Sequence, residues 1–225
     1  MSAIDTSSWK EFVLGDILRK VDVQKIQLKK NECSAMQTKE YDLPARTATT
    51  QNQGLSCYVP RDIATVLKNK ISVSANGDYC AFWHDSEFTI LQDSYALEGN
   101  GFELTEDIAL FLIGCMNRAF AKKYNWNNKS GWEKLKLETI KLPVTEAEEI
   151  DWEYMSERIA ELESERIAEL ESERIAELEK YLTATGLNDY ELTEEDRQIL
   201  ATKLTEGGIT KLDIWRWLLE RSKKV

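Results

Sequence analysis

"SERIAELESERIAELESERIAELE", residues 156–179, is one eight-residue unit written three times without a change. Its Ile and Leu residues recur at positions 159, 162, 167, 170, 175 and 178. Eight residues of straight helix advance about 800°, so the apolar pair of each copy is rotated by roughly 80° from the pair before it. The repeat therefore predicts a helix whose apolar stripe drifts around the axis in the right-handed sense, unlike a seven-residue coiled coil.

The helix predicted around the repeat runs from about Ala147 to Thr185, because this range holds no Gly or Pro and Gly186 provides a stop. A helix of this length, about 55 Å, must project from the domain or pair with another long element. Its Glu and Arg content favours a solvated, ion-paired spacer over direct chemistry. Two short helices are expected after it, from Thr193 to about Leu204 and from Thr210 onward.

The residues before this helix predict a mixed α/β region. Strand-like runs such as SCYV, KISVS, YCAFW and FTILQ alternate with turn signals, and residues 70–83 predict a hairpin over Asn76-Gly77. Residues 105–124 predict a helix that Thr105 caps and that carries Lys122 and Lys123 in its last turn. The chain is thus expected to divide into residues 1–145 and a helical part, residues 146–225.

Charge is distributed unevenly between these two parts. The formal net charge is −11, but residues 1–145 carry 18 Lys and Arg against 18 Asp and Glu, whereas residues 146–225 carry 11 against 22. A local basic surface on the neutral first part is therefore compatible with the net charge. The four cysteines have no CxxC spacing and a single histidine accompanies them, so neither a metal nor a cofactor is expected. No signal peptide or membrane span is evident, which predicts a reduced cytoplasmic protein.

Five segments, taken together and in order, resemble the DNA-specificity (S) subunit of type I restriction-modification systems. They are SSWKEFVLGDIL, QGLSCYVPRD, ISVSANGDYCAFWHDSEF, YNWNNKSGWEKLKLETIKLPV and IDWEYMSERIAELE. The resemblance covers about residues 8–190. It implies a target-recognition domain followed by a long conserved helix that pairs antiparallel with a second helix and holds two recognition domains apart on DNA.

The chain stops where a second domain opening is expected in that family, so it resembles a half subunit with one recognition domain. Two copies would then form a two-fold homodimer on a palindromic, interrupted target. The implied partners are double-stranded DNA, methyltransferase (M) subunits and restriction (R) subunits, with no membrane. The partner would methylate adenine after flipping it out of the duplex.

Two polar segments carry the side chains that base recognition needs, namely Arg or Lys for guanine, Asn or Gln for adenine, and cations for phosphates. The first, PARTATTQNQG, supplies Arg46, Thr50, Gln51, Asn52 and Gln53. The second, RAFAKKYNWNNKSGWEK, supplies Arg118, Lys122, Lys123, Tyr124, Asn125, Asn127, Asn128 and Lys129. The competing interpretation makes the first a solvated loop and the second a structural segment with Trp126 and Trp132 in the core.

Several enzyme classes are disfavoured by the sequence. The Gly99-x-Gly101 pair lacks the third glycine of a nucleotide-binding loop, and a hairpin turn explains His84-Asp85 better than a catalytic pair does. Neither an Asn/Asp-Pro-Pro-aromatic motif nor a phosphate-binding Gly-Lys occurs. A non-catalytic specificity subunit is therefore expected. The rival hypothesis is a structural or adaptor coiled-coil protein whose globular head binds protein.

Overall fold

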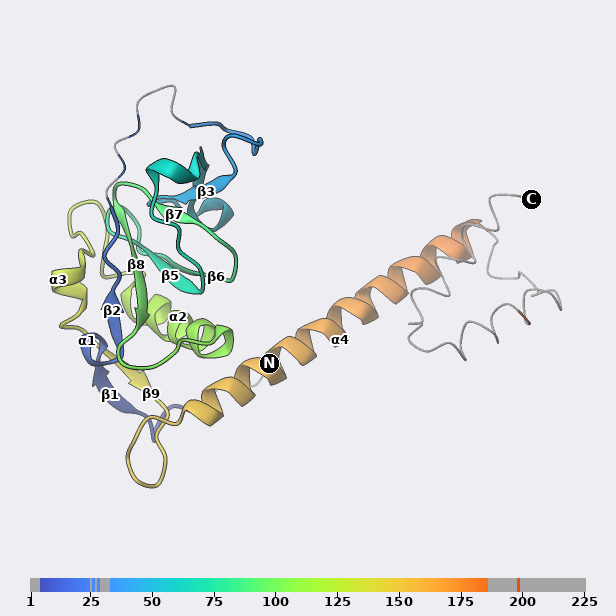
Figure 1. Cartoon of the computed structure of the whole chain (residues 1–225). Helices are drawn as coiled ribbons and strands as arrows, with labels where there is room; N and C mark the ends of the chain where they lie inside the picture. The colour runs from blue at the N-terminus through green and yellow to red at the C-terminus, as the bar shows by residue number, and fades with distance from the viewer. Residues whose placement is uncertain (1–4, 25, 27, 29–32, 186–197, 199–225) are drawn as a thin grey trace. The chain divides into compact units, whose positions relative to one another are not determined.

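The computed structural model describes residues 5–24, 26, 28, 33–185 and 198. The chain divides into two units, Met1–Glu161 and Leu162–Val225. The first unit is a mixed α/β domain, and the long helix that follows it is continuous with its last residues (Figure 1). The predicted fold class, a mixed α/β domain followed by a long helix, is confirmed. The two short helices predicted after Gly186 lie outside the described residues.

The N-terminus is joined to the end of the domain by a two-stranded sheet. Strand β1 (Lys10–Val13) pairs antiparallel with β9 (Thr139–Leu142), and Phe12 lies opposite Ile140. After the short helix α1 (Leu14–Ile17), the chain enters the main sheet. This pairing places the first strand beside the last strand before the long helix.

The main sheet has four strands in the order β2-β8-β5-β6. They are β2 (Leu18–Lys20), β8 (Ser94–Gly99), β5 (Lys70–Ser74) and β6 (Ala81–His84), and all pair antiparallel. The predicted hairpin is confirmed as β5 and β6. Its connection spans residues 75–80, and Gly77 occupies the left-handed region at φ 82°.

Helix α2 (Glu106–Phe120) packs on one face of this sheet (Figure 1). Thr105 occupies the predicted N-cap position, although its side chain forms no capping hydrogen bond. The expectation that Lys122 and Lys123 lie in the last turn is wrong, because the helix ends at Phe120. The amides of Lys123 and Tyr124 both donate to the Phe120 carbonyl, so a turn replaces the last predicted turn of helix.

A second, three-stranded sheet has the order β4-β3-β7 and a small core of its own. Its strands are β3 (Leu43–Arg46), β4 (Leu55–Val59) and β7 (Thr89–Ile90). The short 3-10 helices η1 (Gln51–Gly54) and η2 (Arg61–Ile63) flank β4. The candidate loop of residues 47–54 therefore connects two paired strands, which fixes both of its ends.

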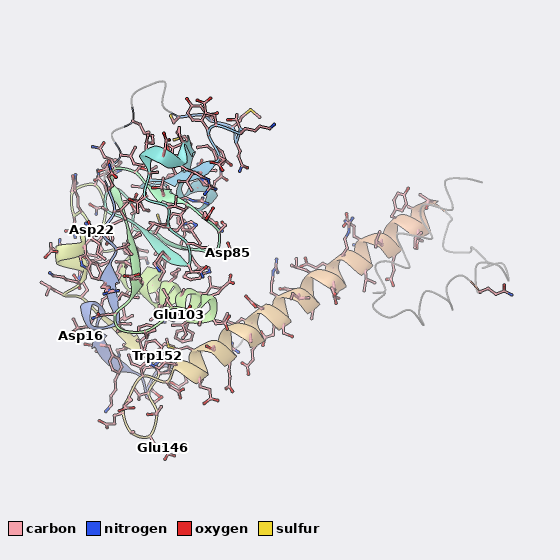
Figure 2. The ribbon with its side chains drawn as sticks, viewed as in Figure 1. Asp16, Asp22, Asp85, Glu103, Glu146 and Trp152 are labelled. Atoms are coloured by element: carbon pink, nitrogen blue, oxygen red, sulfur yellow. The ribbon has the colours of Figure 1, made fainter. Side chains whose placement is uncertain are left out.

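Helix α4 spans Trp152–Thr185, so the expected start at Ala147 is wrong. A bridge between Val144 and Ile150 holds residues 144–150 in a turn instead. Asp151 caps the helix, since its Oδ1 accepts a hydrogen bond from the Tyr154 amide at 2.9 Å. The first helical residue, Trp152, packs its ring on Phe102 with centroids 4.7 Å apart (Figure 2). The short helix α3 (Trp132–Leu135) and strand β9 come before the turn of residues 144–150.

The first turns of α4 belong to the domain. Met155 is fully buried and Ile159 packs against the same core. The compact unit consequently extends to Glu161, beyond the boundary expected after residue 145. The division into residues 1–145 and 146–225 as functional parts stays a prediction.

The repeat forms an ion-paired helix, as predicted. Each copy carries one Arg to Glu pair three residues apart, Arg158 with Glu161, Arg166 with Glu169 and Arg174 with Glu177, at 2.8, 2.6 and 2.5 Å. The surroundings of the copies differ, however, since Ile167 is 58% exposed whereas Ile159 packs on the domain core. The difference arises because the first copy begins within the domain, whereas Ile167 lies beyond Glu161.

Candidate nucleic-acid interface

Three segments meet around the end of strand β5. We call them the left-handed loop (residues 47–54), the hairpin turn (residues 75–80) and the asparagine turn (residues 121–131). The Cys80 thiol donates to the Thr49 carbonyl at 3.7 Å, which joins the hairpin turn to the left-handed loop. The Ser130 hydroxyl donates to the Ser74 carbonyl at 2.6 Å, which joins the asparagine turn to β5. The structure therefore brings both predicted polar segments beside one hairpin.

The left-handed loop has an unusual backbone. Asn52, Gln53 and Gly54 all have positive φ, at 47°, 52° and 81°. Such a conformation is costly for residues with a Cβ and persists only where surrounding contacts impose it. The Thr47 amide closes the loop by donating to the Gly54 carbonyl at 2.8 Å. The side chains of residues 50–53 are exposed as a result.

Arg46 supports this loop from below. Its Nη1 donates to the carbonyl of Asn52 at 3.0 Å and to the carbonyl of Gln53 at 3.3 Å. The side chain is half-buried, and burial lowers the pKa of the guanidinium. Nη1 of Arg46 thus bonds to the two residues with the costly backbone, so Arg46 supports the loop.

The asparagine turn is held by its own side chains. Asn125 and Asn128 exchange two backbone hydrogen bonds of 3.1 Å, and Oδ1 of Asn125 also accepts from the amides of Asn127 and Asn128. The Asn128 amide group donates to the Lys123 carbonyl at 2.7 Å. Because the side chains of Asn125 and Asn128 are engaged in this way, they shape the turn and leave Asn127 free to project.

Tyr124 is buried at 1% exposure, beneath the turn. Its hydroxyl donates to Glu138 at 2.7 Å, and Lys123 forms an ion pair with the same carboxylate. Burial alone raises the pKa of Glu138, but the hydrogen bonds and positive charge of these partners outweigh burial and lower it. Tyr124 is therefore a support of the turn, not a surface contact.

Sequence reasoning missed Trp126. The competing interpretation places Trp126 in the core and is wrong there, since the residue is 68% exposed, whereas Trp132 does pack against the core as that interpretation expects. The indole lies against the hairpin turn: a Cβ added to Gly77 would lie 3.4 to 3.5 Å from three of its ring atoms. The lysines and asparagines that surround Trp126 in the sequence are the signal that could have indicated its exposure.

The other predicted cationic residues lie in two different places. Lys122 and Lys129 are exposed on the asparagine turn and form no ion pair with any described residue. Arg118 lies elsewhere, in a groove of about 520 Å³ that Trp9, Ile159 and the strands β1 and β9 help to line. The exposed predicted residues gathered around the hairpin turn are Thr50, Gln51, Asn52, Gln53, Lys122, Asn127 and Lys129. Asp78 is an exposed acid on the same hairpin turn.

A buried histidine lies behind the left-handed loop. His84 is 3% exposed, its Nε2 lies 2.8 Å from the Ser72 hydroxyl, and its ring packs on Phe88. Burial, with the positive charge of Arg46, lowers the pKa of His84 to about 4. The residue is therefore neutral at pH 7. The predicted hairpin turn at His84-Asp85 is wrong, because His84 is the last residue of β6 and the next strand, β7, belongs to the other sheet.

This low pKa predicts acid sensitivity. Because the unfolded histidine binds its proton near pH 6.5, the unfolded chain gains a proton first as the pH falls, and stability is lost between about pH 6.5 and 4. Between pH 7 and 4.5 the free energy of unfolding should fall by about 2 kcal/mol more in the wild type than in His84→Gln. Urea unfolding at both pH values measures this difference. Equal pH dependence of the two proteins would contradict the assignment.

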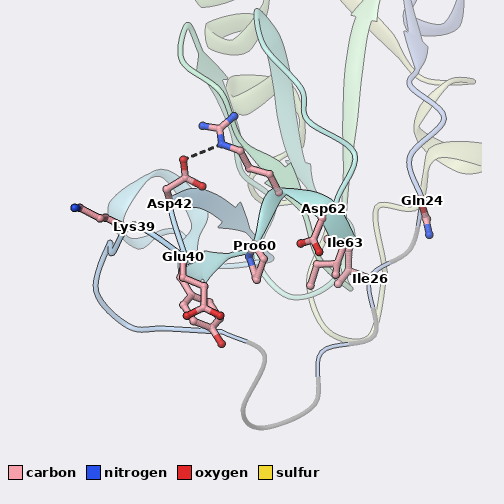
Figure 3. Close-up of a pocket in the computed structure, with 10 residues that line it drawn as sticks. Gln24, Ile26, Lys39, Glu40, Asp42, Pro60, Asp62 and Ile63 are labelled. Atoms are coloured by element: carbon pink, nitrogen blue, oxygen red, sulfur yellow. Dashed lines mark hydrogen bonds and ion pairs between the residues drawn. The ribbon is translucent and has the colours of Figure 1, made fainter.

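A second hollow, of about 710 Å³, lies beside the three-stranded sheet (Figure 3). Arg61 is the central cation, but its Nε donates to Asp42 at 2.8 Å and its Nη1 to Glu87 at 2.7 Å. Glu40 and Asp62 also line it. Since the acids outnumber the cations there, this hollow does not suit a phosphate.

Among the described residues, no group of three or more His, Cys, Asp or Glu is arranged to hold a metal ion. Within the same residues, no helix is both long and apolar enough to cross a membrane. The four cysteines are free thiols, and burial raises the pKa of Cys57, Cys80 and Cys115.

The family of this chain is shown by a family model that covers most of the mixed α/β domain and the first part of the long helix. The family model described as the type I restriction modification DNA specificity domain matches residues 6–172. The chain belongs to this family, which confirms the resemblance seen in its sequence. No curated protein sequence matches the chain.

Two solved structures align with the chain. The type I restriction-modification S subunit from M. genitalium aligns with a TM-score of 0.50 and 15% identity, over 74% of this chain and 42% of that one. The HsdS subunit from Thermoanaerobacter tengcongensis aligns with a TM-score of 0.48 and 12% identity, over 74% and 40%. This chain therefore spans less than half the length of either subunit.

Proposed function

We propose that the protein is the sequence-specific DNA-binding subunit of a type I restriction-modification complex and recognises one half-site with the surface around its hairpin turn. The observation that carries this proposal is the exposure of amide and cationic side chains on two loops held by internal hydrogen bonds. Amide groups suit adenine, and lysines suit guanine or phosphate. Rigid presentation of such groups reduces the entropy lost on binding.

The proposed set of contact residues is smaller than the set that the sequence predicts. We assign direct contacts to Thr50, Gln51, Asn52, Gln53, Lys122, Asn127 and Lys129. Arg46, Lys123, Tyr124, Asn125 and Asn128 support the two loops through the contacts described above. Arg118 lies in a separate groove, so we assign it to a contact with a phosphate or a partner subunit and not to a base contact.

The assembly follows from the second part of the chain. We propose that two copies pair through α4 as an antiparallel homodimer, so that two recognition domains face a bipartite palindromic target. Methyl transfer to adenine and DNA cleavage then belong to the methyltransferase and restriction subunits. The exposed apolar residues Ile167 and Leu170, at 58% and 47%, are available for pairing.

Salt dependence tests the DNA proposal. If Lys122 and Lys129 each neutralise one phosphate, replacing both with Ala should reduce the slope of log affinity against log salt by about 2 and weaken binding on the order of tenfold. Binding of a genomic duplex pool is measured by anisotropy between 50 and 200 mM salt, with and without the co-expressed methyltransferase subunit. The loss should be similar for all sequences, since phosphates carry no base identity.

Lys68→Ala is the matched control, because Lys68 is exposed near the start of β5, whereas the proposed interface surrounds the end of that strand. It should leave the slope close to that of the wild type. A wild type that ignores DNA and salt would favour the adaptor hypothesis. A double variant with an unchanged slope would place the phosphate contacts elsewhere.

A further inference from the structure

Trp126 is the large apolar residue that the candidate interface presents. At 68% exposure it is among the most exposed large hydrophobic residues of the described chain. Leaving an indole in water is less favourable than burying it. A tryptophan on a binding surface is a frequent source of binding energy. It therefore needs an explanation that its polar neighbours do not.

The turn that carries Trp126 is preorganised. Residues 125–128 form a four-residue turn, closed by the two reciprocal backbone hydrogen bonds of Asn125 and Asn128. Lys134 also donates to Oδ1 of Asn128 from the following helix. Trp126 and Asn127 occupy the two central positions and are both exposed. The backbone thus holds the indole outward without using the indole itself.

Gly77 lies beside one side of the Trp126 indole. A Cβ at this position would lie 3.4 Å from Cε2 and 3.5 Å from Cζ2 and Nε1, which is van der Waals contact. The φ of 82° at Gly77 also disfavours any residue with a side chain. The hairpin turn therefore lies close to one side of the ring, and the residue is still 68% exposed.

The chemistry around the indole indicates what it contacts. Lys122 and Lys129 flank it without ion pairs to described residues, which suits a polyanion better than a neutral protein surface. In the major groove, the thymine 5-methyl is the apolar group that base edges offer. We propose that Trp126 determines specificity by packing against the 5-methyl group of a thymine in the half-site. The inference rests on the proposed DNA-binding function.

Removal of one methyl group from DNA tests this directly. Duplexes that carry the site selected by the wild type from a random pool are prepared with each thymine replaced in turn by uracil, which lacks the 5-methyl. At one position in each half-site, uracil should weaken wild-type binding by about three- to tenfold. The same replacement should change the affinity of Trp126→Ala by less than twofold. The wild type is measured with its methyltransferase subunit present.

Two further variants separate a contact from a folding defect. Trp126→Phe keeps an aromatic ring and should retain part of the preference for thymine over uracil, whereas Trp126→Ala should lose it at an unchanged melting temperature. Lys68→Ala is the control, because Lys68 is exposed near the start of β5 and outside the proposed interface; it should keep the full thymine preference.

The outcomes are distinguishable. A wild type that selects no sequence overturns the proposed function itself. A wild type that selects a site but tolerates uracil at every position overturns only the assignment of Trp126. Loss of methyltransferase binding in Trp126→Ala, with DNA preference intact, would also overturn it and make Trp126 a protein contact.

Discussion

Deletion of one octad, residues 164–171, is expected to shorten the spacer between the two half-sites while leaving each half-site unchanged. Each copy contributes about 12 Å of helix, which corresponds to roughly three to four base pairs. Its removal also rotates the paired apolar residues by roughly 80°. The deletion should therefore yield a target with a shorter spacer, or abolish recognition through mis-orientation, and an added fourth copy should act in the opposite direction.

Selection of bound duplexes from a random pool measures both half-sites and their separation. The matched control replaces residues 164–171 with eight other helix-forming residues, which keeps the length and should keep the spacer. The three Arg to Glu pairs are local to their copies, so the deletion leaves two intact. A deletion variant with the original spacer and full affinity would make the repeat a plain acidic helix.

Arg46→Ala should weaken DNA binding by about 10- to 100-fold and relax the half-site sequence. The guanidinium donates to the carbonyls of Asn52 and Gln53, both in the left-handed region. Hydrogen bonds from a charged donor contribute about 1.5 to 3 kcal/mol, and their loss lets this loop leave its costly conformation. Competition binding with the selected site and with its single-base variants measures affinity and preference together.

Arg61→Ala is the control for this experiment. It removes two ion pairs of 2.8 and 2.7 Å but lies at the opposite end of β4 from the left-handed loop. It should leave DNA preference unchanged. Arg46→Lys keeps the charge but loses the forked donor, so partial loss is expected. An Arg46→Ala protein with full preference would show that the loop holds its shape unaided.

Much of the fold could be predicted from the sequence because its local signals agree with the tertiary structure. The strand-like runs became β4, β5, β6 and β7, and the repeat became a continuous helix with regular ion pairs. The errors lie at helix ends. Ala147 has helix-forming neighbours, but the bridge from Val144 to Ile150 holds this segment in a turn. After Phe120 the helix gives way to a turn, in which the Phe120 carbonyl accepts hydrogen bonds from two amides.

The candidate site was predicted only in part, since composition identifies polar residues but not their partners. The side chains of Arg46, Asn125 and Asn128 bond to backbone groups of their own loops, a choice that depends on loop geometry. Trp126 was missed for the complementary reason. An indole in a mixed sequence is usually buried, but this one lies at a central position of the four-residue turn 125–128 and is exposed.

We propose that this chain directs adenine methylation to one bipartite sequence. The most direct measurement is to co-express it with a cognate methyltransferase subunit and to map methylated adenines across the host genome. We expect one two-part motif with two-fold related half-sites and a fixed spacer, absent from cells that express the methyltransferase alone. A complex that forms but leaves no bipartite motif would contradict the account.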